Sequence, residues 1–169
     1  IENIILATHP DSNFYLSKLI LSKQKNLFVE KPVVTEQKQL TKLINIAKKN
    51  SKQLMGGYIY LFNTYIKKMK KIIDDKKLGK IKYISIQRKN LGPIRNKVDS
   101  HMDLASHDIS ILIYLFNKKI KINKIEKRNI LKKNISDIST LSLKINSIKF
   151  DINSSWLHPY KQREILIIG

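Results

Sequence analysis

Two short groups of side chains in the sequence have types and spacings that could support chemistry. Asp103 and His107 are four residues apart, so on one helical turn both side chains lie on the same face and could reach one ligand. An imidazole exchanges a proton near neutral pH, which suits general acid–base catalysis. The second group is Glu30-Lys31-Pro32, in which an acid and a base follow an apolar run and the proline holds Lys31 extended.

Each group also has an ordinary structural explanation. Glu30 and Lys31 could form a salt bridge at the end of a strand, of a kind that is usually weak. Asp103 follows Ser100 by three residues and could complete a capping box, and His107 could be a satisfied structural histidine. The spacing of the histidines and carboxylates predicts no metal site. The remaining histidines are predicted to be non-catalytic: His9, His101 and His158.

The first third of the chain alternates between short apolar runs and helical patterns. This order predicts right-handed crossovers and a parallel sheet. Lys31 then lies at the carboxyl end of a strand, which is the edge where open α/β sheets bind ligands. The runs that are typical of buried parallel strands are Asn3 to Ala7, Leu27 to Glu30 and Gln53 to Gly57.

Two helices are predicted between these strands. Asp11 or Ser12 is expected to cap the first helix, which runs to about Lys25, and Thr35 to cap the second, which runs to Asn50. The apolar residues expected to pack against the sheet are Phe14, Leu16, Leu19 and Ile20 in the first helix and Leu40, Leu43, Ile44 and Ala47 in the second.

The rest of the chain has a different pattern. Helices are predicted at 65–75, with a basic face, and at 109–116, and the strand at 81–88 alternates with Ile81, Tyr83, Ser85 and Gln87 on one face. Together the two parts indicate an α/β protein in which a parallel sheet is followed by an open, mainly antiparallel sheet. The other predicted strands are 120–128, 138–145, 149–156 and 164–168.

The composition gives a net charge of +20 without cysteine. Such a charge suggests a polyanionic partner, but nearly all of it comes from lysine, which accompanies heavy use of isoleucine and asparagine. All three have A/T-rich codons, so coding bias explains the lysines, and their spread along the helices is typical of solvated faces. No secretory signal or membrane-spanning stretch is evident. We therefore expect a cytoplasmic protein that binds neither nucleic acid nor membrane.

Five segments resemble, in order and spacing, the glucose-fructose oxidoreductase/inositol dehydrogenase/MocA family. Within that family, Arg88-Lys89-Asn90-Leu91-Gly92 is similar to a segment of the sugar and nucleotide-sugar dehydrogenases. The five segments are Ala7-Thr8-His9-Pro10, Val29-Glu30-Lys31-Pro32, Gly57-Tyr58-Ile59-Tyr60-Leu61-Phe62-Asn63, Asp103-Leu104-Ala105-Ser106-His107-Asp108 and Ser155-Trp156-Leu157-His158-Pro159.

The resemblance implies two domains and a reaction. Residues 1–58 would be part of a dinucleotide-binding Rossmann domain, and residues 59–169 a substrate-binding and oligomerisation domain. A hydride would pass between a sugar or nucleotide-sugar carbon and the nicotinamide of NAD or NADP, while a base takes the hydroxyl proton. The family also implies a homo-oligomer.

The site residues implied by the resemblance fall into three groups. Lys31, Asp103 and His107 would be catalytic, with His107 as the base and Lys31 stabilising alkoxide character. Lys31, Asp103 and His107 would also contact substrate, together with Tyr58 and Arg95. The expected cofactor-binding residues are Thr8, His9, Pro10, Glu30, Lys31 and Pro32.

The sequence departs from the family pattern in two ways. None of its five glycines forms the Gly-x-Gly-x-x-Gly turn, and Asn13 stands where many members have histidine. The chain also opens on a strand with Ile1. We therefore expect a piece of a longer protein, truncated at both ends and inactive alone; an intact divergent protein is the alternative. Two other functions stay open: a basic module that binds a polyanion, and an inactive relative retained for its oligomer interface.

The absent glycine turn predicts weak NAD binding by these 169 residues alone. That turn normally supplies most contacts to the pyrophosphate, because its backbone N–H groups meet the phosphates at a helix N-terminus. Calorimetric titration of the chain with NAD should show little or no heat of binding, whereas a micromolar dissociation constant would contradict this prediction.

Overall fold

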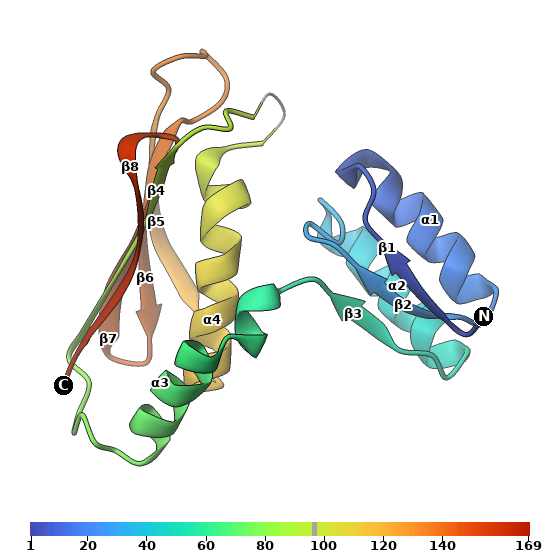
Figure 1. Cartoon of the computed structure of the whole chain (residues 1–169), viewed down its shortest axis with the longest axis horizontal. Coiled ribbons are helices and arrows are strands. Elements are labelled where there is room, and N and C mark those ends of the chain that lie inside the picture. The colour runs from blue at the N-terminus through green and yellow to red at the C-terminus, as the bar shows by residue number, and fades with distance from the viewer. Residues whose placement is uncertain (96–97) are drawn as a thin grey trace. The chain divides into compact units, whose positions relative to one another are not determined.

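The computed structural model describes residues 1–95 and 98–169, which form two compact units (Figure 1). The first unit comprises Ile1–Ile59 and the second Tyr60–Gly169. No helix in the described ranges combines the length and the apolar character needed to cross a bilayer.

The first unit is a three-stranded parallel sheet with two helices, as the alternation of apolar runs predicted. Its strands lie in the order β1 (Asn3–Leu6), β2 (Asn26–Val29) and β3 (Leu54–Gly56), and both pairs are parallel. The connections are α1 (Pro10–Ser22) and α2 (Gln37–Lys49). The parallel sheet is therefore confirmed.

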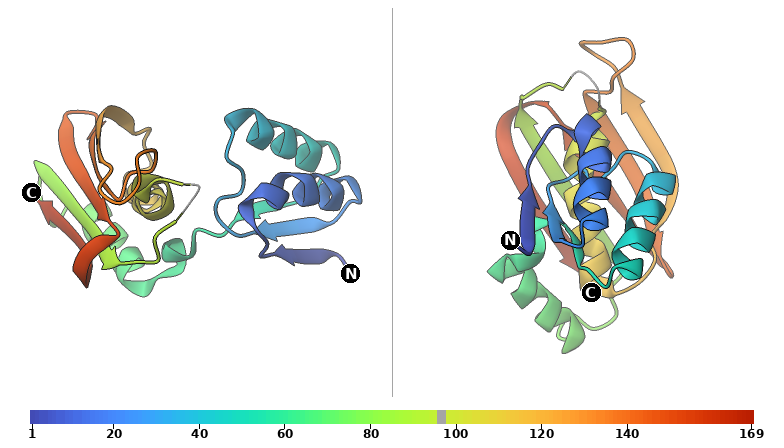
Figure 2. Two further views of the ribbon diagram at one scale, coloured as in Figure 1. Left: turned by 90° about the horizontal axis from the view of Figure 1, so that it is seen from above. Right: turned by 90° about the vertical axis from the view of Figure 1, so that its right-hand side faces the viewer.

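Both helices of the first unit pack on the same face of its sheet (Figure 2). The opposite face carries a row of apolar side chains, because Ile5 pairs in register with Phe28 and Phe28 with Met55. Ile5 is 76% exposed, and no described helix of this unit covers the row. The buried core on the covered face consists of Leu6, Leu21, Leu27, Val29, Leu43 and Ala47.

The capping residues predicted for the two helices of this unit differ from those in the structure. His9 caps α1, since its Nδ1 atom accepts a hydrogen bond from the backbone N–H of Asp11 (3.4 Å) and Pro10 opens the helix. Proline suits that position because its missing N–H would have no partner there. Glu36, and not Thr35, stands at the N-cap of α2 and makes no capping hydrogen bond through its side chain.

Some residues that were predicted to pack in these helices are exposed. Leu19 is 47% exposed, and Leu40 and Ile44 also face solvent, while Leu21, Leu43 and Ala47 are buried. The apolar stripe of each helix is therefore narrower than the sequence suggested, because two helices share one face of a three-stranded sheet.

The second unit is a five-stranded sheet with helices on one face. The boundary between the units falls within the 3₁₀ turn η1 (Ile59–Phe62), and α3 (Thr64–Asp74), the π-helical turn η2 (His101–Ala105) and α4 (Ser106–Phe116) are the helical elements. The strands are β4 (Tyr83–Leu91), β5 (Lys121–Arg128), β6 (Ile138–Ile145), β7 (Ile148–Ser155) and β8 (Leu157–Ile168).

The sheet of the second unit has the order β5-β6-β7-β4-β8. All neighbouring pairs are antiparallel except β4 and β7, which are parallel. The parallel pair arises because the chain passes through η2, α4 and the β5–β6 hairpin before β7 returns beside β4. An α/β protein with a parallel sheet followed by an open, mainly antiparallel sheet is thus confirmed.

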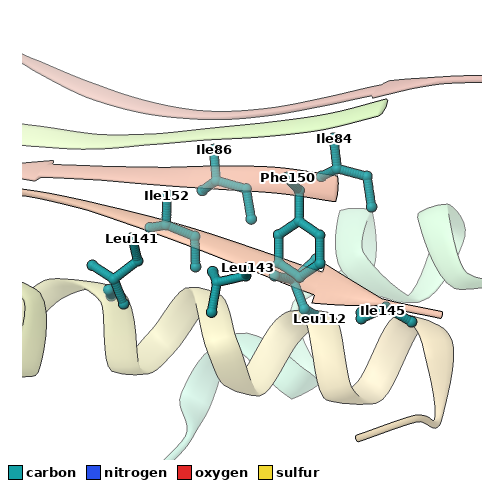
Figure 3. Close-up of a cluster of buried hydrophobic side chains, with 9 residues drawn as sticks. Ile84, Ile86, Leu112, Leu141, Leu143, Ile145, Phe150 and Ile152 are labelled. Atoms are coloured by element: carbon teal, nitrogen blue, oxygen red, sulfur yellow. The ribbon is translucent and has the colours of Figure 1, made fainter. Parts of the chain in front are cut away.

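Helix α4 runs along one face of this sheet and covers the apolar core formed by the strands (Figure 3). Leu112 of α4 packs against Ile84, Ile86, Phe150 and other inward-facing side chains. In β4 the even-numbered residues Ile84, Ile86 and Arg88 face the core, whereas Tyr83, Ser85 and Gln87 lie on the other face. No described helix of this unit covers that other face (Figure 1).

Candidate functional site

The carboxyl edge of the parallel sheet is held together by Asn13. This side chain is buried, and its Oδ1 atom accepts a hydrogen bond from the Thr8 hydroxyl (2.9 Å). Its Nδ2 atom donates to the backbone oxygen of Pro32 (2.9 Å) and, at 3.5 Å, to that of Glu30. Asn13 thus joins the loop after β1 to the loop after β2, which together carry all the predicted cofactor-binding residues except Pro10, the first residue of α1.

Glu30 turns back towards its own backbone. Its carboxylate accepts a hydrogen bond from the Lys31 N–H at 3.0 Å, and Lys31 is joined to Pro32 by a cis peptide bond. Gly57 approaches Glu30 so closely that an added Cβ atom would lie 2.9 Å from Oε2 and 3.1 Å from the Glu30 Cα atom. A glycine is therefore needed beside the Lys31 loop.

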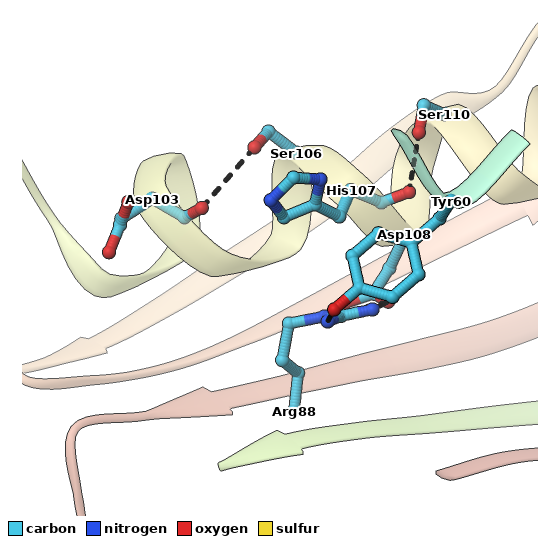
Figure 4. A network of polar contacts seen from close by, with 7 residues as sticks. All are labelled: Tyr60, Arg88, Asp103, Ser106, His107, Asp108 and Ser110. Carbon is cyan, nitrogen blue, oxygen red and sulfur yellow. Dashed lines mark hydrogen bonds and ion pairs between the residues drawn. The ribbon is translucent and has the colours of Figure 1, made fainter. Parts of the chain in front are cut away.

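In the second unit, Arg88 and Asp108 form a buried ion pair (Figure 4). The Arg88 Nε atom donates to both carboxylate oxygens of Asp108 (2.9 and 2.8 Å), and Nη2 donates to Oδ1 (2.5 Å). Burial raises the pKa of Asp108, although the contacts with Arg88 and the charge of Arg163 oppose this shift. Burial acts to lower the pKa of Arg88, but hydrogen bonds and attraction to Asp108 outweigh it and raise the pKa.

Tyr60 connects this ion pair to His107. Its hydroxyl accepts a hydrogen bond from Nη1 of Arg88 (3.1 Å), and the guanidinium carbon lies 4.6 Å from the centre of the Tyr60 ring. On its other side the ring meets the imidazole of His107 edge to face, with ring centres 5.0 Å apart and planes at 72° (Figure 4). Tyr60 therefore contacts both the buried ion pair and His107, the residue predicted to be the base.

The π-helical turn η2 is anchored by Asp99. The carboxylate of Asp99 accepts hydrogen bonds from the Ser136 N–H (2.8 Å) and the Lys127 ammonium (2.7 Å), and its backbone oxygen accepts one from the Asp103 N–H (3.1 Å). Burial acts to raise the pKa of Asp99, but Lys127 and Ser136 outweigh it and lower the pKa.

The capping box suggested for Asp103 is not formed by Ser100. The Ser100 hydroxyl instead pairs with the Ser139 hydroxyl at 2.9 Å and makes no capping hydrogen bond. The Asp103 carboxylate lies 3.5 Å from Nε of Arg95, which joins two of the predicted substrate-binding residues. Because Asp103 lies in a π-helical turn and His107 in α4, the spacing of a regular α-helix does not apply between them.

The predicted site residues are divided between the two units. Arg95, Asp103 and His107 belong to the second unit, whereas the first contains Thr8, His9, Pro10, Glu30, Lys31, Pro32 and Tyr58. Within the described ranges, no three His, Asp or Glu side chains gather closely enough to hold a metal ion.

Sequence reasoning overlooked four residues that shape these groups: Asn13, Tyr60, Arg88 and Asp108. Asn13 was noted only as a departure from the family pattern. Arg88 carried a signal, since it continues the inward alternation of Ile84 and Ile86 and so needs a buried partner. Asp108 carried one too, because it falls on the buried stripe of α4 with Ile111 and Leu115.

Both units match models of known protein families. Residues 1–58 match the family described as "Oxidoreductase family, NAD-binding Rossmann fold", and residues 66–169 match the "GFO/IDH/MocA C-terminal domain". The chain belongs to the GFO/IDH/MocA oxidoreductase family. The family resemblance of the five sequence segments is therefore confirmed. A comparison with curated protein sequences finds no match.

Solved structures of this oxidoreductase family share the fold. An inositol dehydrogenase homolog from Azotobacter vinelandii, complexed with NADH and myo-inositol, is 17% identical with a TM-score of 0.91, and 100% of this chain covers 48% of that one. The myo-inositol 2-dehydrogenase from Lactobacillus plantarum is 15% identical with a TM-score of 0.89, and the match covers 100% of this chain and 55% of that one. An oxidoreductase from Pseudomonas syringae is 16% identical with a TM-score of 0.89, and the match covers 100% of this chain and 48% of that one. The chain thus spans about half the length of these proteins.

The Asn13 contacts predict that Asn13→Asp destabilises the first unit. A carboxylate cannot donate to the oxygens of Pro32 and Glu30, so buried acceptors would lose their donor at a cost of about 1 to 3 kcal/mol. Amide hydrogen exchange in β1 and β2 should then speed up. The control is Asn45→Asp on the exposed side of α2, and equal exchange in both variants would contradict the bridging role.

Proposed function

We propose that the protein is an NAD(P)-dependent oxidoreductase that transfers a hydride between a hydroxyl-bearing carbon of a sugar or nucleotide sugar and nicotinamide. The observation that carries this proposal is the environment of His107. The imidazole lies at the start of α4, next to the turn that holds Asp103, and is backed by Tyr60 and a buried ion pair. Membership of an oxidoreductase family supplies the reaction class.

His107 is proposed to remove the hydroxyl proton as the hydride leaves carbon. A base at this point must touch the substrate hydroxyl and exchange its proton near neutral pH, and imidazole meets the second requirement without help. His107 is half-buried and its Nδ1 atom is shielded from solvent, so Nε2 would be the atom that takes the proton. Asp103 and the exposed Arg95 beside it would hold neighbouring hydroxyls, because a carboxylate and a guanidinium offer both an acceptor and donors to a polyol.

The first unit is proposed to hold the nicotinamide end of the cofactor. Its loops after β1 and β2 present a hydroxyl, an imidazole and an ammonium group at the carboxyl edge of a parallel sheet, through Thr8, His9 and Lys31. These groups fit the carboxamide and ribose of a dinucleotide. NAD, when bound, would supply the hydride acceptor. Lys31 is proposed to stabilise negative charge that develops on the substrate oxygen, which is the role that the family resemblance implies for it.

The substrate class follows from the polar groups of the second unit. Asp103, Arg95 and His107 suit a ligand rich in hydroxyl groups, and one solved structure of similar fold is described as a complex with NADH and myo-inositol. A cyclic polyol or sugar is therefore the first substrate to test. The uncovered face of the five-stranded sheet carries the exposed side chains of Tyr83, Leu166 and Ile168 and would be available for a homo-oligomer, as the family resemblance implied.

No observation favours the alternative of a polyanion-binding module. Exposed lysines occur on α1, α2, α3 and β5, so they are spread over helices and a strand of both units. A surface that tracks a nucleic-acid backbone gathers its lysines on one face with aromatic residues between them.

The proposed base is tested by His107→Ala in the protein expressed from its complete gene. Oxidation of myo-inositol and common sugars should fall by about 10²- to 10⁴-fold, because general base catalysis contributes that much, while affinity for NAD stays nearly the same. His158→Ala is the control, since the ring of His158 bonds the backbone oxygen of Tyr160 and has no proposed role. Turnover equal to that of the control would contradict the assignment.

A further inference from the structure

Tyr60 is held on several sides by groups whose own positions are fixed. Arg88 cannot move without uncoupling from Asp108, and it both bonds the Tyr60 hydroxyl and lies over the ring. The guanidinium carbon of Arg163, on β8, lies 5.9 Å from the centre of the same ring. The Tyr60 ring therefore has little freedom to rotate, since a shift would break a charge-assisted network in the interior.

A fixed neighbour of this kind can orient the imidazole of His107. The outer torsion of a histidine side chain has a broad preference, so the ring orientation is set by what it touches. Ser110 bonds the backbone oxygen of His107 (2.6 Å), which secures the helix and not the ring. The edge-to-face contact with Tyr60 acts on the ring itself, and aromatic pairs prefer this arrangement.

We propose that Tyr60 is a positioning residue for His107, acting as the link through which the buried Arg88–Asp108 pair fixes the orientation of the imidazole. This inference rests on the proposed function of His107 as the base. In this arrangement Tyr60 does not touch the reacting atoms. Its ring limits the directions in which the imidazole nitrogens can point, so that one of them can meet the substrate hydroxyl.

A purely structural role for Tyr60 is the competing explanation. Tyr60 also packs against the apolar cluster of Ile66, Ile111 and Leu115, so removing its ring would loosen the contact between α3 and α4. A loss of activity alone would not separate the two roles. The separation requires a variant that keeps the ring and a signal that reports the imidazole directly.

The experiment compares Tyr60→Leu with Tyr60→Phe, and Tyr65→Leu is the control because Tyr65 is 78% exposed on α3. Histidine ring signals are recorded by NMR in the 169-residue chain, and turnover is measured in the protein expressed from its complete gene. Tyr60→Leu should shift the His107 ring protons, which lose the ring current of Tyr60, and leave those of His158 in place. It should also lower turnover by roughly 10²-fold, as expected for a small misplacement of a catalytic group.

Rescue by phenylalanine decides between the two roles. Tyr60→Phe loses the hydrogen bond from Arg88 but keeps the guanidinium over the ring and the edge-to-face contact, so it should retain the His107 signals and most of the turnover. The proposal is overturned if Tyr60→Leu leaves the His107 signals unchanged, or if it lowers turnover no more than Tyr65→Leu does. If His107→Ala proves active while the NMR shifts occur as expected, the proposed base is wrong but the ring contact stands.

Discussion

The ion pair between Arg88 and Asp108 is the interaction on which the second unit most depends. Both charges are removed from water, and the three hydrogen-bond contacts between the guanidinium and the carboxylate offset part of the cost of desolvation. The pair joins the middle of β4 to the first turn of α4. It therefore fixes the helix that carries His107 against the sheet. The pair lies between the buried apolar core and the polar side chains of the candidate site.

The apolar periodicity of the sequence was sufficient to predict the order of strands and helices and the parallel sheet. These features follow from burial, which each residue records locally through its type and spacing. The helix caps were less predictable, because Asp11, Ser12 and Thr35 are all good capping residues and the structure uses His9 and Glu36 instead. At α1, Pro10 opens the helix, so the residue before it, His9, becomes the cap.

The candidate site could be predicted only in part, for a physical reason. The residue types of His107 and Asp103 identify them as candidates, but the groups that orient them come from distant parts of the chain. Arg88 is 20 residues from Asp108 and 28 from Tyr60, so periodicity can mark each residue as buried but cannot identify its partner. Asn13 was equally hidden, since its role depends on two loops meeting at one sheet edge.

A double-mutant cycle on Arg88 and Asp108 tests the central role of the ion pair most directly. Urea unfolding is followed by the fluorescence of Trp156, the single tryptophan, which is buried in the second unit. Arg88→Met and Asp108→Leu should each cost about 3 to 5 kcal/mol, because each leaves one buried charge unpaired. The double variant should cost at least about 1 kcal/mol less than the sum of the two. The exposed pair Lys70 and Asp74 is the control, with a coupling of about 0.5 kcal/mol or less. Additive losses at Arg88 and Asp108 would contradict this account.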